Sequence, residues 1–309
     1  MFIHEESRLI PKNFQRRPSP SLRKKRNTMP PTSYLIVGSG VFGASTALHL
    51  IRKYPDSRII LVDRDAHDAP TRVAASWDWN KVIRADYRDI VYTKLGLEAQ
   101  QLWRTDEIWK PFYHESGVFW ISPSNFGEEV LKNFEKLGAE VDMRLCPVEE
   151  ARGLYGGLFD DADYTGVKEV LINKSSGWAE AKEALQSTIQ AAINLGVSYI
   201  AAEVTSLEFS DLGDGRRCCG VKLAQGLVIE ADKVVLCTGA FTPKLLMDSA
   251  PEWTHLHVGD RILAAAVTEG VAPLSQDYRG ILATMPVGIN DNPTERGKKS
   301  SSRLWMDVY

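Results

Sequence analysis

The feature that constrains this chain most is the stretch at 34–50, which reads YLIVGSGVFGASTALHL. An apolar run ends at Gly38, and Gly40 and Gly43 complete the spacing GxGxxG before small and apolar residues recur at helical intervals. A short apolar run bounded by glycine is typical of a buried strand. The stretch therefore predicts a strand over 33–38 that turns directly into a helix.

The helix, expected over 41–54, leads into a second apolar run at 58–63. This run, RIILVD, is apolar almost throughout, as expected for a strand that is covered on both faces. A helical crossover joins strands that are parallel neighbours in a sheet. These residues therefore predict a βαβ unit, and with it an α/β fold.

The glycines of this unit have the spacing of a dinucleotide-binding turn. Gly38 would permit the tight turn, Gly40 would let the backbone approach a pyrophosphate, and Gly43 would let the helix pack closely on the strand. The pyrophosphate would meet the N–H groups and the positive end of the helix dipole. Asp63 ends the second strand 20 residues after Gly43, where an acid accepts hydrogen bonds from a ribose diol. NAD and FAD both bind in this way, and a glycine cluster that serves only packing is the alternative.

Beyond this unit the chain does not continue as alternating strands and helices. Nicotinamide dehydrogenases usually add further βα units, whereas here turns at 213–215 and 225–226 predict a β-meander, followed by VVLCTGA, a buried strand that breaks at Gly239. This layout favours a flavoprotein, with an NAD(P)-dependent dehydrogenase as the alternative. Helices are expected at 89–104, 126–138 and 178–195, and strands at 117–122, 197–201, 203–210, 217–224, 227–231 and 260–268. The four strands between 197 and 231 would form the β-meander.

Charge is distributed unevenly along the 309 residues. Residues 1–28 hold eight Lys or Arg against Glu5 and Glu6, so the remaining residues carry 29 basic and 38 acidic side chains. Such an acidic body is poorly suited to nucleic acid, whose phosphates require a positive surface. The proline-rich residues 1–32 predict a disordered basic extension.

The composition of the whole chain, with 44% apolar and 25% charged residues, is that of an ordinary soluble protein. The sequence contains no run of 18 apolar residues, so it predicts no transmembrane helix. The four cysteines form neither a CxxC pair nor a ligand pattern with histidine, so no metal site is predicted.

Six motifs follow one another along the chain: IVGSGVFG (36–43), LVDRD (61–65), SWDWNKVIRADY (76–87), FYHESGVFWIS (112–122), SSGWAEAKEAL (175–185) and VVLCTGAFTPKLL (234–246). In this order they resemble the fungal FAD-dependent amine oxidases of the D-amino-acid-oxidase superfamily, in the branch that contains sarcosine oxidase, fructosyl amino acid oxidases and saccharopine oxidase. The resemblance runs from about Ser33 to about Pro293.

This resemblance implies an α/β fold, α+β overall, in which a Rossmann-like FAD-binding domain with a β-meander is interleaved with a smaller, sheet-based substrate domain. The FAD-binding domain would comprise 33–113 and 170–246, and the partial substrate domain 114–169 and 247–293. Residues 294–309 form a divergent tail. Members of the family usually continue past this C-terminus, so we expect a C-terminally truncated chain, and a non-catalytic FAD-binding remnant is a further alternative.

The resemblance also implies which residues contact FAD. Residues of the glycine-rich turn would line the pyrophosphate, Asp63 and Arg64 would meet the adenosine end, and Ser76 would begin a segment that passes along the flavin to Lys81. The backbone of Val204 would meet the adenine, while Thr238 and Gly239 would approach the cofactor from the returning strand. The residues implied at the pyrophosphate are Gly38, Gly40, Val41, Phe42 and Gly43.

Lys81 and Arg84 are the candidate catalytic residues. Tryptophans at 77 and 79 and the apolar pair at 82–83 suggest a buried segment, in which a cation needs an anionic or electron-rich partner. Arginine binds carboxylates through a bidentate fork, and a lysine beside a flavin would stabilise developing negative charge. By resemblance, Lys81 lies against the flavin and Arg84 binds the substrate carboxylate, whereas two solvated surface charges are the alternative.

The reaction that the resemblance implies is oxidation of the C–N bond of a secondary amine or N-substituted amino acid. Hydride moves to flavin N5, water hydrolyses the resulting imine, and dioxygen reoxidises the flavin and yields hydrogen peroxide. The partners are therefore a small amine or amino-acid substrate and dioxygen, without nucleic acid or membrane. We expect a cytoplasmic monomer, with a peroxisomal location for a full-length form.

Overall fold

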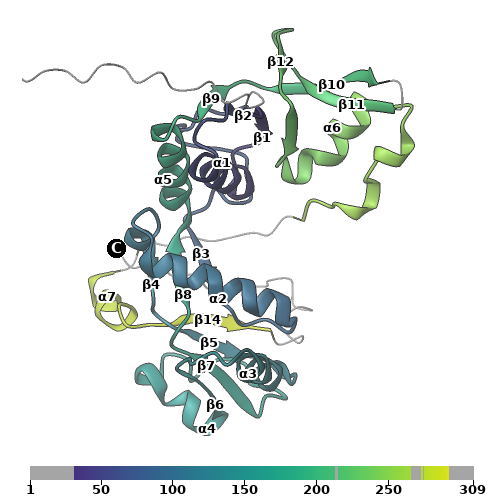
Figure 1. Cartoon of the computed structure of the whole chain (residues 1–309). Helices are drawn as coiled ribbons and strands as arrows, with labels where there is room; N and C mark the ends of the chain where they lie inside the picture. Colours follow the sequence, from purple (N-terminus) through teal and green to yellow (C-terminus); the bar gives the residue numbers. More distant parts are fainter. Residues whose placement is uncertain (1–30, 213–214, 266–272, 274, 292–309) are drawn as a thin grey trace, which may run out of the picture. The chain divides into compact units, whose positions relative to one another are not determined.

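The computed structural model describes residues 31–212, 215–265, 273 and 275–291 (Figure 1). Of the predicted basic extension at 1–32, only the last two residues fall within these ranges, and the predicted tail at 294–309 lies outside them.

The helices and strands follow the chain in this order: β1 (Tyr34–Val37), α1 (Val41–Lys53), β2 (Ile59–Asp63), β3 (Asn80–Ile83), α2 (Ile90–Thr105), β4 (Tyr113–His114), β5 (Val118–Ile121), α3 (Phe126–Leu137), β6 (Met143–Pro147), α4 (Val148–Arg152), β7 (Glu169–Asn173), β8 (Gly177–Glu180), α5 (Ala181–Asn194), β9 (Ser198–Ala201), β10 (Val204–Leu212), β11 (Gly215–Leu223), β12 (Val228–Glu230), β13 (Lys233–Leu236), α6 (Thr242–Ser249), α7 (Gln276–Leu282) and β14 (Val287–Asn290).

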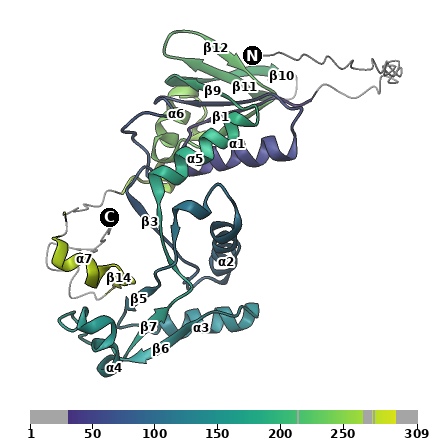
Figure 2. The same ribbon diagram turned by 90° about the vertical axis from the view of Figure 1, so that its left-hand side faces the viewer.

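Four parallel strands form the sheet that carries the glycine-rich turn, in the order β13-β1-β2-β9. Alternate side chains of a strand point to opposite faces. Ile36 and Leu61 therefore pack with α1 and α5 on one face, while Leu35 and Val62 pack with β10, β11 and α6 on the other. Figures 1 and 2 show α1 and α5 side by side along the sheet. Burial on both faces explains why β2 is apolar almost throughout, as predicted.

A second sheet has the order β14-β5-β7-β6, in which β14 runs parallel to β5 and the other pairs are antiparallel. Trp120 and Leu171 face α3 on one side, and Phe119 and Ile172 pack near α4 on the other. A third, antiparallel sheet has the order β3-β8-β4. The predicted division into an FAD-binding and a substrate domain remains a prediction.

The sequence-based expectations were wrong at three places. The strand at 198–201 is not part of the meander but pairs in parallel with β2, so the meander contains only β10, β11 and β12. The helix expected from 178 begins at Ala181, because Gly177–Glu180 forms β8 between two partner strands. The strand expected at 260–268 is absent over 260–265, where a 3-10 turn ends at Arg261, and 266–268 lie outside the described residues.

Candidate functional site

The turn between β1 and α1 needs glycine for steric reasons. Gly38 has a φ of +95°, and a Cβ there would lie 2.5 Å from the carbonyl oxygen of Cys237. A Cβ at Gly43 would lie only 1.7 Å from the carbonyl oxygen of Gly38, so α1 crosses the turn in direct contact with its backbone. The glycine spacing therefore reflects close packing of the turn against β13 and α1.

The N-terminus of α1 follows this turn directly. The first N–H groups of a helix have no intrahelical acceptor, so they can bind an anion. One of them, the N–H of Val41, donates to Ser76 Oγ at 3.0 Å. The side chains of Val41 and Phe42 are 54% and 79% exposed at this end of the helix. A Cβ at Gly40 would lie 3.3 Å from Ser76 Oγ, so Ser76 lies over the turn.

Asp63 lies beside the turn at the carboxyl end of β2. Its Oδ2 accepts a hydrogen bond from the N–H of Ser39 at 2.6 Å, and its Oδ1 accepts one from the N–H of Asp65 at 3.0 Å. Arg72 Nη2 lies 3.1 Å from Asp63 Oδ2. The acid is thus held against the glycine-rich turn with acceptor capacity left on Oδ1.

Arg72 is a residue of this site that the motifs did not indicate. Its side chain is 1% exposed, and Nη2 also donates to Ser39 Oγ. Its guanidinium carbon lies 5.6 Å from the ring centre of Trp77. Nothing in the spacing of the loop at 64–80 marks this arginine, because its position depends on how the loop folds back over the turn.

Other segments predicted to contact FAD also lie around this turn. The N–H of Ala202, two residues before Val204, donates to the carbonyl oxygen of Asp63 at 2.7 Å. The guanidinium carbon of Arg64 lies 5.5 Å from the ring centre of Phe241. The turn at Thr238 and Gly239, with a φ of +51° at the glycine, follows β13 beside β1. The fold therefore gathers these segments at one end of the parallel sheet.

Lys81 does not lie in a buried segment, contrary to the sequence-based argument. Its side chain is 45% exposed and pairs with Asp78, and Trp79 is 58% exposed. Lys81 lies on β3 opposite Ala179 of β8. Burial therefore does not support a role for this lysine, and its place beside a flavin remains a prediction by resemblance.

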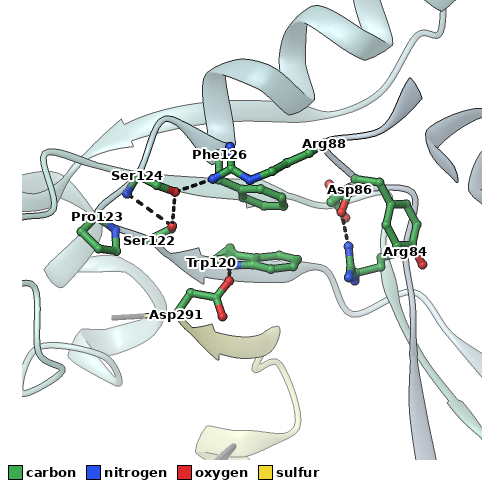
Figure 3. A pocket seen from close by; sticks show the side chains of 10 residues that line it. Arg84, Asp86, Arg88, Trp120, Ser122, Pro123, Ser124, Phe126 and Asp291 are labelled. Atoms are coloured by element: carbon green, nitrogen blue, oxygen red, sulfur yellow. Dashed lines mark hydrogen bonds between the residues drawn. The ribbon is translucent and has the colours of Figure 1, made fainter. Parts of the chain in front are cut away.

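Arg84 lines a pocket of about 370 Å³ (Figure 3). Its guanidinium carbon lies 4.2 Å from the ring centre of Tyr87 and 4.7 Å from that of Trp120, and Nη1 donates to the carbonyl oxygen of Asp86. Two aromatic rings and a backbone acceptor thus orient this cation. The rest of the lining consists of Asp86, Arg88, Ser122, Pro123, Ser124, Phe126 and Asp291.

A buried polar network lies next to Arg84. Asp86 accepts hydrogen bonds from Asn173 Nδ2 at 2.7 Å and from Ser176 Oγ at 3.0 Å. Burial raises the pKa of the Asp86 carboxyl above its ordinary value, although these hydrogen bonds and the nearby Arg84 act to lower it. Gln100 Nε2 donates to Ser176 Oγ at 3.2 Å and continues the network.

Within the described ranges, no group of three His, Cys, Asp or Glu side chains is placed to hold a metal ion. No helix in the described part of the chain is long and apolar enough to cross a membrane.

Comparisons with known proteins assign a family. Residues 33–282 match the family model DAO, described as FAD dependent oxidoreductase. The chain is 30% identical over 220 residues to L-saccharopine oxidase of Schizosaccharomyces pombe, covering 67% of this chain and 50% of that protein. It is also 30% identical over 252 residues to amino acid oxidase fsqB of Aspergillus fumigatus, covering 70% of this chain and 50% of the relative. The chain thus spans about half the length of the curated relatives it matches.

Solved structures show the same fold. A fructosyl peptide oxidase matches with a TM-score of 0.63 at 24% identity, covering 84% of this chain and 59% of that one. The fructosamine oxidase of Aspergillus fumigatus matches with a TM-score of 0.62 at 23% identity, covering 85% and 59%. Together with the family match over most of its length, the glycine-rich turn and Asp63 place this chain in the DAO family of FAD-dependent oxidoreductases.

Proposed function

We propose that the chain binds FAD with the ADP half at the β1–α1 turn. The observation that carries this proposal is the meeting of three features at one sheet end: a turn closed by Gly38 and Gly43, the N-terminus of α1, and Asp63 with acceptor capacity on Oδ1. The helix N-terminus suits the pyrophosphate, and the acid suits a ribose diol. The residues present therefore fit the dinucleotide that the family uses.

We propose further that this site serves oxidation of the C–N bond of a secondary amine or N-substituted amino acid. Bound FAD supplies the two-electron acceptor, which dioxygen reoxidises with release of hydrogen peroxide. The substrate becomes an imine, which water hydrolyses. The similar proteins named saccharopine oxidase, amino acid oxidase and fructosyl peptide oxidase support this substrate class.

Within this proposal, Arg84 binds the substrate carboxylate in the pocket of Figure 3. A guanidinium recognises a carboxylate through two parallel N–H groups, and it does so best when its own orientation is restricted. The rings of Tyr87 and Trp120 restrict Arg84 in this way. Lys81, by resemblance, stabilises negative charge beside the flavin.

The experiment is a peroxide assay on purified FAD-loaded protein with saccharopine, sarcosine, pipecolate and fructosyl amino acids. A yellow protein that absorbs near the flavin maximum and releases peroxide with one of these amines is the expected result. A yellow protein without peroxide would leave only FAD binding, as in the non-catalytic alternative. A colourless protein would contradict the FAD site itself.

Arg84→Ala tests the substrate contact. We expect kcat/KM for a carboxylate-bearing amine to fall by roughly 10- to 100-fold, because a charged hydrogen bond is lost, while FAD affinity changes little. Arg152→Ala is the matched control, since Arg152 also stacks on a ring, that of Tyr164 at 4.4 Å, but does not line the pocket. Equal effects of the two substitutions would argue against carboxylate binding by Arg84.

We propose that the protein is a cytoplasmic monomer. Light scattering coupled to size-exclusion chromatography measures the oligomeric state, and a mass near twice that of the chain would contradict the monomer.

A further inference from the structure

The guanidinium of Arg72 is buried at the glycine-rich turn and has donors left over. Its Nη2 is used by Asp63 Oδ2 and Ser39 Oγ. Its Nε and Nη1 are buried and have no hydrogen-bond partner among the residues that the structure describes. Arg72 therefore presents two N–H bearing atoms in a place closed to bulk solvent.

Such an arrangement calls for oxygen acceptors. Arginine keeps its charge at any ordinary pH, so the group cannot relieve the cost of burial by losing a proton. A buried donor without a partner is destabilising, and native proteins rarely keep one. Asp63 already balances the charge at 3.1 Å, so the missing partner is an acceptor oxygen rather than a further carboxylate of the protein.

The location of the guanidinium indicates where those oxygens come from. Ser39, to which Arg72 donates, lies between the first two glycines of the turn, and its own N–H donates to Asp63. Ser39 Oγ also lies 3.1 Å from the hydroxyl of Tyr199, which in turn donates to the carbonyl oxygen of Asp65 at 2.6 Å. Arg72 thus touches both the turn and the acid that face the ADP half of a dinucleotide.

We propose that Arg72 is a further cofactor-binding residue, whose Nε and Nη1 donate to oxygens of the ADP half of FAD. This inference rests on the proposed FAD site. The two sources of such oxygens are the pyrophosphate and the ribose, and both offer acceptors without a competing positive charge. The contact adds a buried cation to the backbone N–H groups at the N-terminus of α1.

The test measures binding rather than turnover. Isothermal titration calorimetry gives the affinity of the apoprotein for ADP and for adenosine, and quenching of flavin fluorescence gives that for FAD. Arg72→Met removes the donors but keeps an apolar stem of similar length. Arg58→Met is the matched control. Arg58 also donates to an oxygen, the carbonyl of Glu230, but it lies just before β2, at the opposite end of the strand from Asp63.

We expect Arg72→Met to weaken the binding of ADP and FAD by roughly 10- to 100-fold, because hydrogen bonds from a charged donor are lost. The affinities of Arg58→Met should equal those of the wild type. Loss for ADP but not for adenosine identifies the pyrophosphate as the acceptor, and equal loss for both identifies the ribose. Affinities unchanged by Arg72→Met would overturn the proposal.

A second variant separates contact from positioning. Arg72→Lys keeps a cation beside Asp63 but has only one nitrogen, so it rescues affinity only if Arg72 acts by holding Asp63. Full rescue of the affinity by lysine would therefore overturn direct contact. So would an Arg72→Met substitution that no longer lowers the affinity once Asp63 is replaced by Asn. If Arg72→Met does not fold, as judged by thermal unfolding of the apoprotein, the lysine variant alone decides. Wild-type protein that binds ADP but not FAD would contradict the proposed function and still permit the test of Arg72.

Discussion

At the scale of single residues, the glycine-rich turn behaves as its spacing predicts because the constraint is local. A side chain at Gly38 or Gly43 would collide with backbone atoms of the turn or of the strand beside it. Backbone atoms cannot rotate away as a flexible side chain can. Local sequence does not predict the role of Arg72, because its contacts with Ser39 and Asp63 join a loop residue to the turn after β1 and to the end of β2.

Gly43→Ala should destabilise the protein because its Cβ would meet the carbonyl oxygen of Gly38 at 1.7 Å. The cost is expected to be about 3 kcal/mol or more, at or above the usual penalty of overpacking. Gly280→Ala, on α7, meets nothing within 4 Å and should be neutral or slightly stabilising. Urea unfolding of both variants measures the difference, and equal free energies of unfolding would contradict the steric argument.

Asp86 should make stability depend on pH. Burial raises the pKa of its carboxyl above the ordinary value of 3.8, so just above pH 3.8 the folded state binds more protons than the unfolded state. The stability of the wild type relative to Asp86→Asn should therefore increase as the pH falls from 7 toward 4. Urea unfolding across this range measures the trend.

A second substitution checks the cause. Asn173 donates to Asp86 Oδ1 and acts to lower the pKa of that carboxyl. Asn173→Ala should therefore raise the pKa further and extend the pH-dependent range upward. A relative stability that rises with pH would show that Asp86 is favoured in its ionised form.

At the scale of elements, hydrophobic periodicity and composition predicted those strands and helices whose buried face is visible in their own sequence. α1 and α5 bury small and apolar residues at helical spacing against one face of the parallel sheet. The helix expected from 178 is wrong over 178–180, because these residues belong to β8, which pairs with β3 and β4 from earlier in the chain. Pairing with strands from distant parts of the chain cannot be predicted from the residues of the segment itself.

Ile189→Ala tests the packing of α5. Ile189 is fully buried in the core between α1, α5 and the parallel sheet. Removing its side chain should cost about 2–5 kcal/mol, through lost burial and the cavity left behind. The neighbouring Gln190→Ala, exposed on the same helix, should change the free energy of unfolding by less than about 0.5 kcal/mol. Equal losses in the two variants would exclude this core as the source of the helix's stability.

At the scale of the whole molecule, one parallel sheet brings distant segments to a single end. The turn after β1, Asp63 of β2, the approach to Val204 after β9 and the turn after β13 all follow carboxyl ends of parallel strands. Ligands of open parallel sheets bind outside the carboxyl ends of the strands. In the proposed function, this sheet end is therefore where the ADP half of the cofactor binds.

FAD should raise the unfolding temperature in a concentration-dependent way, and FMN, which lacks the ADP half, should raise it much less. At 100 times the dissociation constant, a ligand that binds only the folded state adds about 2.7 kcal/mol to the free energy of unfolding. Differential scanning calorimetry with matched concentrations of the two flavins measures the effect. Equal shifts would mean that the sheet end is not the main binding site.

The sequence by itself determined the βαβ unit, the glycine-rich turn and the acid at the end of β2. Each depends on residues within a few tens of positions, where strand, turn and helix preferences act directly. Only the tertiary structure decided that β9 joins the parallel sheet, that β14 lies beside β5, that Lys81 is exposed, and that Arg72 is buried against Asp63. These features arise from contacts between distant segments, and burial of a polar side chain depends on what covers it rather than on its neighbours in the chain.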